Sequence, residues 1–324
     1  MTDYTAATTT DEILEGIDLT GRHFVITGAS SGLGEETTRA LASHGATVTM
    51  LARNSDKTAA AAQRIRDAVP SADLHQAQLD LADLASVRSI GDRLDGRPID
   101  VLINNAGVMA CPYGTTADGF ETQFGTNHLG HFVLTATLMP SILAGDAPRV
   151  VTLSSAAHGR SDVDLADPGF TATEYDPWIS YGRSKSANAL FARELAKRSA
   201  GTGLLSFSVH PGGIRTELGR HLTPEMIQEM LDGLDERSNE ASGDDNGGGG
   251  GFEFKSVEAG AATQVWAATG TAAEHNGSYL ADCRVGEPGV DVGSFGVEPH
   301  ILDDTTAAAL WDLSEELTGQ TLSF

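Results

Sequence analysis

The sequence predicts one α/β domain built on a doubly wound parallel sheet. Two observations predict this fold class: short apolar segments alternate with helical patterns between residues 23 and 209, and the first apolar segment leads directly into a glycine-rich turn. Strands that alternate with helices form parallel sheets with helices on both faces. Ligands bind such sheets at the carboxyl ends of the strands, so we expect functional residues to follow the strands.

The expected elements follow one another in a regular order. Strands are predicted over His23–Thr27, Thr47–Ala52, Leu74–Gln78, Ile99–Ile103, Arg149–Leu153 and Leu204–Val209. Helices are predicted over Gly32–His44, an alanine-rich stretch ending near Pro70, a segment capped by Asp83, and Phe120–Leu143, Tyr181–Ser199 and Val257–Ala268. Gly45 can end the first helix, and Asp83 can accept hydrogen bonds from the free amides of the helix that it precedes.

Two regions stand outside this alternation. Residues 1–20 are rich in Thr, Asp and Glu, and we expect a solvated arm or a short helix before a domain that runs over residues 21–324. Residues 238–251 include five consecutive glycines and cannot build a core, so they are expected to form a flexible surface loop. The surrounding stretch, 215–255, could be a mobile substrate-loop insertion that covers the crevice; a tolerated surface insertion is the alternative for the glycine run.

The composition narrows the classes of function. A formal net charge of -24 makes binding to a nucleic-acid backbone unfavourable. The longest apolar runs are too short to cross a bilayer, so the protein is expected to be soluble and cytoplasmic, with no membrane span. Cys111 and Cys283 are the only cysteines, and no clustered ligand spacing accompanies them, so neither a disulfide framework nor a metal site is expected.

The glycine-rich turn after the first strand predicts a Rossmann-type site for a dinucleotide. Its sequence, TGASSGLG, covers residues 27–34 and opens the first helix. Glycine lets the backbone approach a diphosphate closely, and the free amides at the start of a helix attract negative charge. The spacing differs from the GxGxxG fingerprint, and a plain tight turn is the alternative. The expected cofactor contacts in this turn are Gly28, Ser30, Ser31, Gly32, Leu33 and Gly34.

The residue after the second strand bears on the choice of cofactor. An NAD-selective site would carry a carboxylate here to bind the ribose hydroxyls, whereas this chain carries Arg53. A guanidinium forms charge-assisted hydrogen bonds with a 2'-phosphate, worth about 1.5 to 3 kcal/mol. The sequence therefore favours NADP(H), with NAD as the alternative if Arg53 is simply a solvated arginine.

Tyr181 and Lys185 form the candidate catalytic pair. They are four residues apart on a predicted helix, so their side chains project from one face. A phenol with a pKa near 10 is a poor base at neutral pH, and lowering its pKa by three units requires a preference of about 4 kcal/mol for the phenolate. A nearby ammonium group and an oxidised nicotinamide both carry the charge that favours this.

Together these motifs resemble the short-chain dehydrogenase/reductase family, over about residues 20–215. The matching motifs are the phosphate turn, Asp80-Leu81, Asn104-Asn105-Ala106-Gly107, Asn127, Ser154-Ser155, Tyr181 with Lys185, and Pro211-Gly212. Further segments resemble the retinol dehydrogenase and WW-domain oxidoreductase branch and extend the match to about residue 285: residues 127–132, 186–188, 210–212 and 279–283.

The resemblance implies hydride transfer between a nicotinamide and a carbonyl or alcohol group of a hydrophobic substrate. It implies that Tyr181 transfers the proton, that Lys185 lowers the pKa of Tyr181 and holds the ribose, that Ser155 bonds the substrate oxygen, and that Asn127 supports a water relay. Ser155 is chosen over Ser154 by analogy, because adjacent strand residues face opposite ways. The remaining cofactor contacts that it implies are Asp80, Leu81, Asn105, Ala106, Gly107, Pro211, Gly212, Ile214 and Thr216.

Two rival functions remain open from the sequence: a non-catalytic NADP-binding sensor or scaffold, and a reductase of carbon-carbon double bonds. Four histidines are expected to be structural, because their spacing matches no set of metal ligands; they are His128, His131, His158 and His210. Analogy with the family implies a homodimer or homotetramer that associates through the long helices carrying Asn127 and Tyr181.

Overall fold

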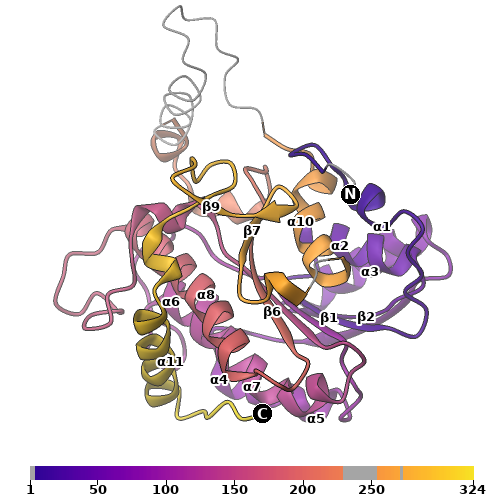
Figure 1. The fold of residues 1–324 in the computed structure, drawn as a ribbon, viewed down its shortest axis with the longest axis horizontal. Coiled ribbons are helices and arrows are strands. Elements are labelled where there is room, and N and C mark those ends of the chain that lie inside the picture. The colour runs from indigo at the N-terminus through magenta and orange to yellow at the C-terminus, as the bar shows by residue number, and fades with distance from the viewer. Residues whose placement is uncertain (1–3, 229–253, 271–272) are drawn as a thin grey trace, which may run out of the picture.

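The computed structural model describes residues 4–228, 254–270 and 273–324. Its centre is an eight-stranded sheet in the order β3-β2-β1-β4-β5-β6-β7-β8 (Figure 1). Every neighbouring pair is parallel except β7 and β8. The strand order reverses between β1 and β4, which is where a doubly wound sheet opens a ligand crevice. The predicted fold class is confirmed.

The six predicted strands are present, with ends within two residues of the predictions. They are β1 (His23–Thr27), β2 (Thr47–Ala52), β3 (Asp73–Gln78), β4 (Val101–Asn104), β5 (Arg149–Leu153) and β6 (Leu205–His210). Successive residues of a strand point to opposite faces of the sheet. Phe24 and Ile26 accordingly belong to one hydrophobic core, whereas Val25, between them, belongs to the other.

The later strands were not predicted. They are β7 (Tyr279–Ala281), β8 (Arg284–Val285), and the separate pair β9 (Glu287–Pro288) and β10 (Gly296–Val297). Each is only two or three residues long. Such segments are too short to show the alternation of apolar and polar residues that identifies a strand in sequence.

Helices cover both faces of the sheet (Figure 1). One layer consists of α2 (Gly32–Ser43), α3 (Ser55–Ala68) and α10 (Val257–Thr269), with α1 (Thr10–Leu14) packed against α10. The other consists of α4 (Leu84–Arg88), α5 (Ile90–Arg93), α7 (Gly130–Leu143) and α8 (Pro177–Arg198), with α11 (Asp304–Thr318) packed against α8. Short 3₁₀ turns are η2 (Ala156–Arg160), η3 (Glu217–His221), η4 (Ala273–His275) and η5 (Pro299–Leu302).

The N-terminal segment forms the short helix that was one of its two expected states. Ile13 and Leu14 of α1 are buried in the same core as β1 and β2. Thr9 caps the helix, and its hydroxyl and backbone amide both bond Glu12. The segment before residue 21 is therefore packed against the sheet domain rather than solvated along its whole length.

Two predicted helices differ from the structure in detail. The stretch Phe120–Leu143 begins at Thr122 and contains a π-helical turn, η1 (Gly125–Leu129), between α6 (Thr122–Phe124) and α7. The helix predicted to open at Tyr181 begins four residues earlier, at Pro177, because the Asp176 carboxylate accepts hydrogen bonds from the amides of the first turn. The predicted loop at 238–251 lies outside the described residues.

Candidate functional site

A cleft of about 1140 Å³ opens where β1, β4, β5 and β6 end. All the cofactor contacts expected from the sequence line it, including the phosphate turn, Arg53, Asp80 and the loop after β6. Ser155, Tyr181 and Lys185 line it as well. Asn127 does not line this cleft and lies behind its wall. Residues from seven segments far apart in the chain thus meet at one edge of the sheet.

Hydrogen bonds join the phosphate turn to the loop that follows β4. The Thr27 hydroxyl accepts hydrogen bonds from the amides of Asn105 and Ala106, both at 2.9 Å. The Asn105 side-chain amide donates to the Thr27 carbonyl at 2.7 Å. Gly28 has a φ of +67°, which glycine adopts without strain. A Cβ on Gly34 would lie 2.4 Å from the Gly28 carbonyl oxygen, so this helix start fits closely under the turn.

His131 links this turn to the helix that carries Asn127. The Thr27 hydroxyl already accepts two amide protons, so its own proton is available for His131 Nε2, 2.9 Å away. His131 Nδ1 then carries the hydrogen that is donated to the Asn127 carbonyl at 2.9 Å. Burial lowers the pKa of His131 to about 4, so the ring is neutral at neutral pH. From the sequence, His131 was expected to be structural only. Its position four residues after Asn127 was the one sequence feature that could have indicated this contact.

The Asn127 side chain, in the π-helical turn, forms hydrogen bonds with two other segments. Its Oδ1 accepts from the Val108 amide at 2.8 Å, and its Nδ2 donates to the Val108 carbonyl and to the Ser184 hydroxyl, each at 2.9 Å. Val108 lines the cleft, and Ser184 precedes Lys185 on α8. Asn127 therefore ties the cleft wall to the catalytic helix; its expected part in a water relay stays a prediction.

Tyr181 and Lys185 lie together on α8, both at most 4% exposed. The Lys185 Nζ is 5.6 Å from the centre of the Tyr181 ring and donates to the Leu153 carbonyl at 2.9 Å. Burial lowers the pKa of Lys185 to about 7. Burial also raises the pKa of Tyr181 to about 12, against the opposing effect of a hydrogen bond with Ser155. In the protein alone, the phenol pKa is thus shifted opposite to the direction that was expected from the sequence, because loss of hydration outweighs the interaction with Ser155.

The two adjacent serines have different surroundings. Ser154 donates to the Lys185 carbonyl at 2.8 Å and is 3% exposed, so its hydroxyl is engaged with the backbone of α8. Ser155 accepts from the Ala157 amide at 3.1 Å, and the interaction of its hydroxyl with the Tyr181 phenol opposes the rise in the phenol pKa. Of the two hydroxyls, that of Ser155 is placed beside the phenol.

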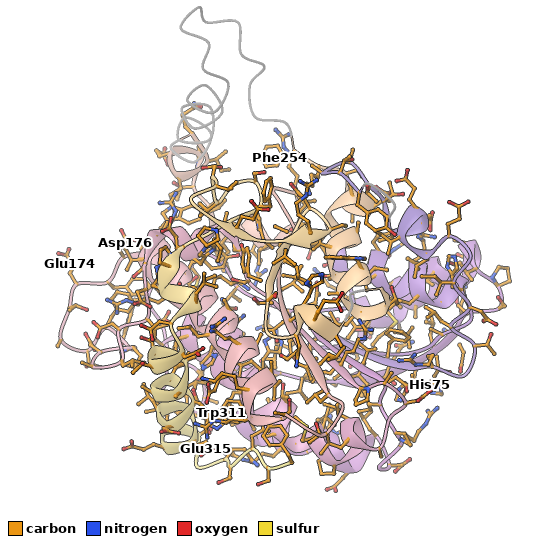
Figure 2. The ribbon with its side chains drawn as sticks, in the orientation of Figure 1. His75, Glu174, Asp176, Phe254, Trp311 and Glu315 are labelled. Carbon is orange, nitrogen blue, oxygen red and sulfur yellow. The ribbon has the colours of Figure 1, made fainter. Side chains whose placement is uncertain are left out.

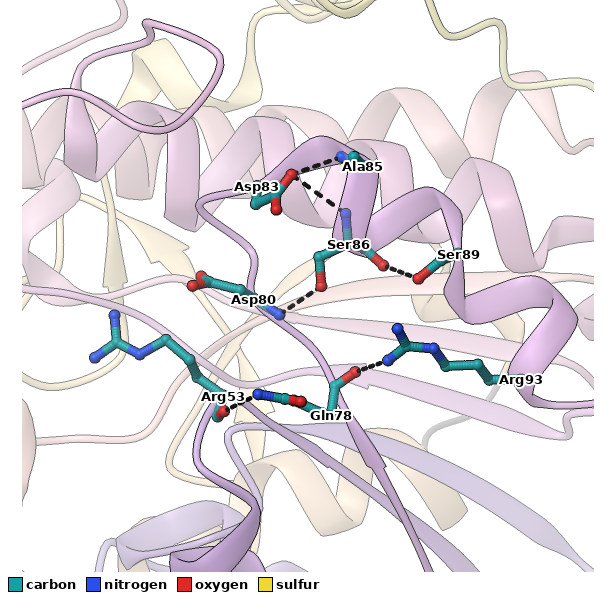
Figure 3. Close-up of a pocket in the computed structure, with 8 residues that line it drawn as sticks. All are labelled: Arg53, Gln78, Asp80, Asp83, Ala85, Ser86, Ser89 and Arg93. Carbon is teal, nitrogen blue, oxygen red and sulfur yellow. Dashed lines mark hydrogen bonds between the residues drawn. The ribbon is translucent and has the colours of Figure 1, made fainter.

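A second hollow, of about 480 Å³, adjoins the cleft at Arg53 and Asp80 (Figure 3). Arg53 is held by its backbone, whose carbonyl accepts from Gln78 Nε2 at 3.1 Å, while its side chain is exposed. Within the described part of the chain, the Arg53 guanidinium forms no ion pair. Arg93 lines the same hollow and donates to the Gln78 carbonyl at 2.7 Å. Asp80 and Asp83 line the hollow together with the two arginines.

Comparison with known proteins agrees with this geometry. The short chain dehydrogenase family model matches residues 22–227. Human retinol dehydrogenase 12 is 37% identical over 308 residues, which cover 94% of this chain and 88% of the relative. A solved structure of an uncharacterised protein from Mycobacterium paratuberculosis covers 100% of both chains at 35% identity with a TM-score of 0.72. One from Beutenbergia cavernae with bound NADP covers 82% of this chain and 96% of that one, at 26% identity and a TM-score of 0.61.

The chain is a short-chain dehydrogenase. Its similarity to retinol dehydrogenases over most of its length places it in that branch of the family. The family is one of nicotinamide-dependent oxidoreductases, so the coarse function expected from the sequence is confirmed. Searched over the same described ranges, the chain contains no helix long and apolar enough to span a bilayer and no cluster of metal-ligating side chains.

Part of the cleft lining in this short-chain dehydrogenase is apolar. The lining includes Val108, Met109, Trp178, Leu218, Leu222, Ile227, Phe254 and Val292. The Trp178 ring contacts the Tyr181 ring edge-on, with 6.4 Å between the ring centres, and the Arg160 guanidinium lies over the Trp178 ring, 4.8 Å from its centre. Leu218, Leu222, Ile227 and Phe254 belong to the stretch 215–255 that was expected to cover the crevice, whereas Val108, Met109 and Val292 carry no sequence motif.

The segment 156–180, between Ser155 and Tyr181, is ordered around one carboxylate. Asp167 is 7% exposed and accepts hydrogen bonds from the amides of residues 171, 172 and 173 and from the hydroxyls of Thr171 and Thr173, at 2.6 to 3.0 Å. Arg183 of α8 donates to the Asp167 carbonyl at 3.0 Å. The loop that borders the cleft is therefore attached to the helix that carries Tyr181.

Proposed function

We propose that the protein is an NADP-preferring oxidoreductase that transfers a hydride between nicotinamide and a carbonyl or alcohol group of a hydrophobic substrate. One observation carries the proposal: the buried Tyr181 and Lys185, with Ser155, line the same cleft as the phosphate turn. A dinucleotide bound along the turn would extend toward the phenol. Chemistry and cofactor binding then share one crevice, as hydride transfer requires.

The residues of the turn fit a nicotinamide dinucleotide. Gly28 and Gly32 have positive φ values and leave the backbone open to the cleft, and a side chain on Gly34 would fill the space under the turn. Gly28, Ser30, Ser31, Gly32, Leu33 and Gly34 would hold the diphosphate, with Asp80 and Leu81 at the adenine and Asn105, Ala106, Gly107, Pro211, Gly212, Ile214 and Thr216 along the nicotinamide half. The cofactor supplies the hydride when bound.

The protein's own part in the reaction is to place and move a proton. In the reductive direction, Tyr181 donates its phenolic proton to the substrate oxygen while Ser155 donates a hydrogen bond to the same atom. A phenol with a raised pKa is protonated at neutral pH, which suits a proton donor. Lys185 then stabilises the phenolate that is left and holds the ribose. We propose reduction as the favoured direction.

The preference for NADP rests on Arg53. Its exposed guanidinium borders the hollow shared with Asp80 (Figure 3), and a 2'-phosphate there would gain a charge-assisted hydrogen bond. The solved structure from Beutenbergia cavernae, of an NAD(P)-dependent dehydrogenase by its description, holds NADP at low occupancy. NAD remains the alternative cofactor, because it differs from NADP only in lacking the 2'-phosphate and would lose only the contact of that group with Arg53.

The proposal of a hydrophobic substrate rests on the apolar side chains that line the cleft. In a cleft with an apolar lining and a few polar groups, burial of the ligand's apolar surface supplies binding energy, and hydrogen bonds fix the orientation of the ligand. Retinol dehydrogenase 12 is named for a hydrophobic alcohol, in agreement with such a lining. The polar contacts of the carbonyl oxygen would be confined to Ser155 and Tyr181.

Calorimetric titration with NADPH and NADH tests the cofactor assignment. For the wild type we expect NADPH to bind at least tenfold more tightly, about 1.4 kcal/mol, and Arg53→Ala to remove that margin. Arg66→Ala is the matched control, because Arg66 lies on α3 and donates to the Leu74 carbonyl outside the cleft. Equal binding of the two cofactors by the wild type would refute the role of Arg53.

Activity assays separate this proposal from its two rivals. A sensor or scaffold would keep its effect after Tyr181→Phe, whereas an oxidoreductase would lose turnover and keep its affinity for NADPH. Product analysis distinguishes a carbonyl reductase, which forms an alcohol, from a reductase of carbon-carbon double bonds, in which the phenol would protonate carbon. Absence of NADPH oxidation with every hydrophobic aldehyde and ketone tested would count against the proposed activity.

A further inference from the structure

The C-terminal helix α11 lies along the outer side of α8 (Figure 1). Its inward side is apolar: Ala307, Leu310 and Trp311 are each at most 2% exposed. Figure 2 shows Trp311 on the side of α11 that faces the body of the protein. This helix had no counterpart in the sequence predictions, and neither the proposed reaction nor the cleft uses it.

Trp311 fills the groove between α7 and α8. Its ring contacts Phe132 of α7 edge-on at 5.3 Å and stacks with Phe191 of α8 at 5.8 Å. Leu310 and Ala307 join a second cluster with Leu129 and Leu190. Without α11, these aromatic and aliphatic side chains of the two long helices would form a contiguous apolar surface, which a folded protein rarely leaves in water.

Polar contacts fix the helix in this groove. The Ser314 hydroxyl bonds His128 Nε2 at 2.8 Å in a buried contact, and Arg88 of α4 donates to the Thr318 carbonyl at 2.7 Å. Along the exposed flank, Arg193 pairs with Asp304 at 2.6 Å and Arg198 with Asp312 at 3.1 Å. The contacts span four helical turns and come from three neighbouring helices, so register and direction are specified.

The segment after α11 closes the same surface. Leu322 is 5% exposed, and its amide donates to Glu315 at 3.1 Å. The Phe324 ring stacks on Trp311 at 6.4 Å. The apolar groove between α7 and α8 is thus covered from Ala307 to the last residue.

We propose that α11 occupies in cis the surface through which a second copy of the chain would pack, and that the protein is a monomer. The resemblance to the family implies association through the helices that carry Asn127 and Tyr181. A second chain can reach the groove between those helices only by displacing α11 together with Trp311. Large apolar side chains at the centre of a patch are what an interface between subunits requires, and here one helix of the same chain already buries them.

Sedimentation velocity on the full chain provides the direct test. We expect a single species with the mass of one chain from low micromolar concentration up to the highest concentration that stays soluble. A dimer or tetramer in that range would overturn the proposal. The measurement uses the unmodified protein and does not depend on cofactor or activity.

A truncation series tests whether the covered surface would pair chains. A chain that ends at Asp303 lacks α11, and we expect it to form dimers or larger species that return to monomers when a synthetic peptide of residues 303–324 is added. A chain that ends at Gly319 keeps α11 and is the matched control, expected to stay monomeric. A soluble, monomeric chain ending at Asp303 would overturn the proposal; if that variant does not fold, sedimentation of the full chain still decides.

Discussion

Replacing Gly34 by alanine would test how closely the phosphate turn must fit the helix beneath it. The added Cβ would lie 2.4 Å from the Gly28 carbonyl oxygen and 2.6 Å from the Asn105 side-chain nitrogen. Ordinary carbon-to-oxygen contacts need more than 3 Å, so the turn or the helix must move by roughly an ångström to accept the methyl group. Gly34 has ordinary helical geometry, so the effect would come from contact and not from backbone strain.

The expected cost follows from what must move. Forcing one extra carbon into a close-packed site costs about 1 to 3 kcal/mol. The displaced groups, Gly28 and Asn105, both line the cofactor cleft. If that cost falls on the bound conformation of the turn, NADPH affinity drops by roughly 5- to 150-fold.

Titration of intrinsic or NADPH fluorescence measures the affinity, and a thermal melt separates loss of binding from loss of folding. Gly91→Ala is the matched control. It also adds a methyl group to a helix, but its Cβ would meet only the Thr137 methyl group, at 3.2 Å, and the Thr137 carbonyl, at 3.9 Å. Unchanged NADPH affinity in Gly34→Ala, with the melting temperature preserved, would refute the idea that the turn and the helix start form one close-fitting cradle.

Three further predictions concern proton transfer and buried histidines. Tyr181→Phe should lower kcat by about 10²- to 10⁴-fold in steady-state assays and change the Kd for NADPH by less than about threefold. His131→Leu leaves the proton of the Thr27 hydroxyl without its acceptor and the Asn127 carbonyl without its imidazole donor, which should cost about 1 to 3 kcal/mol of stability and lower kcat more than it raises KM. Burial lowers the pKa of His128 and His210 to about 3 and of His131 and His158 to about 4. As the pH falls from 7 to 5.5, the unfolded chain therefore takes up protons on these histidines while the folded chain does not. The free energy of unfolding should then fall by roughly 1 kcal/mol per histidine, and Tm should fall with it.

Each of these has an outcome that contradicts it. Retention of more than a tenth of the wild-type kcat by Tyr181→Phe would remove the phenol from proton transfer. For His131, the conservative change to Gln should recover part of the lost kcat, and a variant that alters Tm alone would make the residue structural only. A melting temperature that is constant or rises on acidification to pH 5.5 would mean that the four rings are not held neutral.

The strands and the site were predictable because their signals are local. The run from His23 to Thr27 is apolar and is followed directly by the turn, so the position of the phosphate site could be read from neighbouring residues. Tyr181 and Lys185 were paired by their spacing on one helix. The start of that helix was misplaced by four residues, because the cap at Asp176 has no apolar periodicity around it.

Features that depend on contacts between distant segments were not predictable. His131 is 104 residues from Thr27 in the chain, and only the fold brings the two within 2.9 Å. The rise in the pKa of Tyr181 depends on how deeply α8 buries the phenol, which the spacing of Tyr181 and Lys185 does not reveal.

The sequence by itself determined the alternation of strands and helices, the phosphate turn and the identities of the candidate catalytic residues, because each is written in residues that are neighbours along the chain. The tertiary structure decided which surfaces are covered and which groups lose their water. The helix that carries Leu310 and Trp311 was not predicted, and only packing against Phe132 and Phe191 shows that α11 closes the groove between two other helices. Burial is a property of the whole fold, so its effects on pKa and on association follow only once distant segments meet.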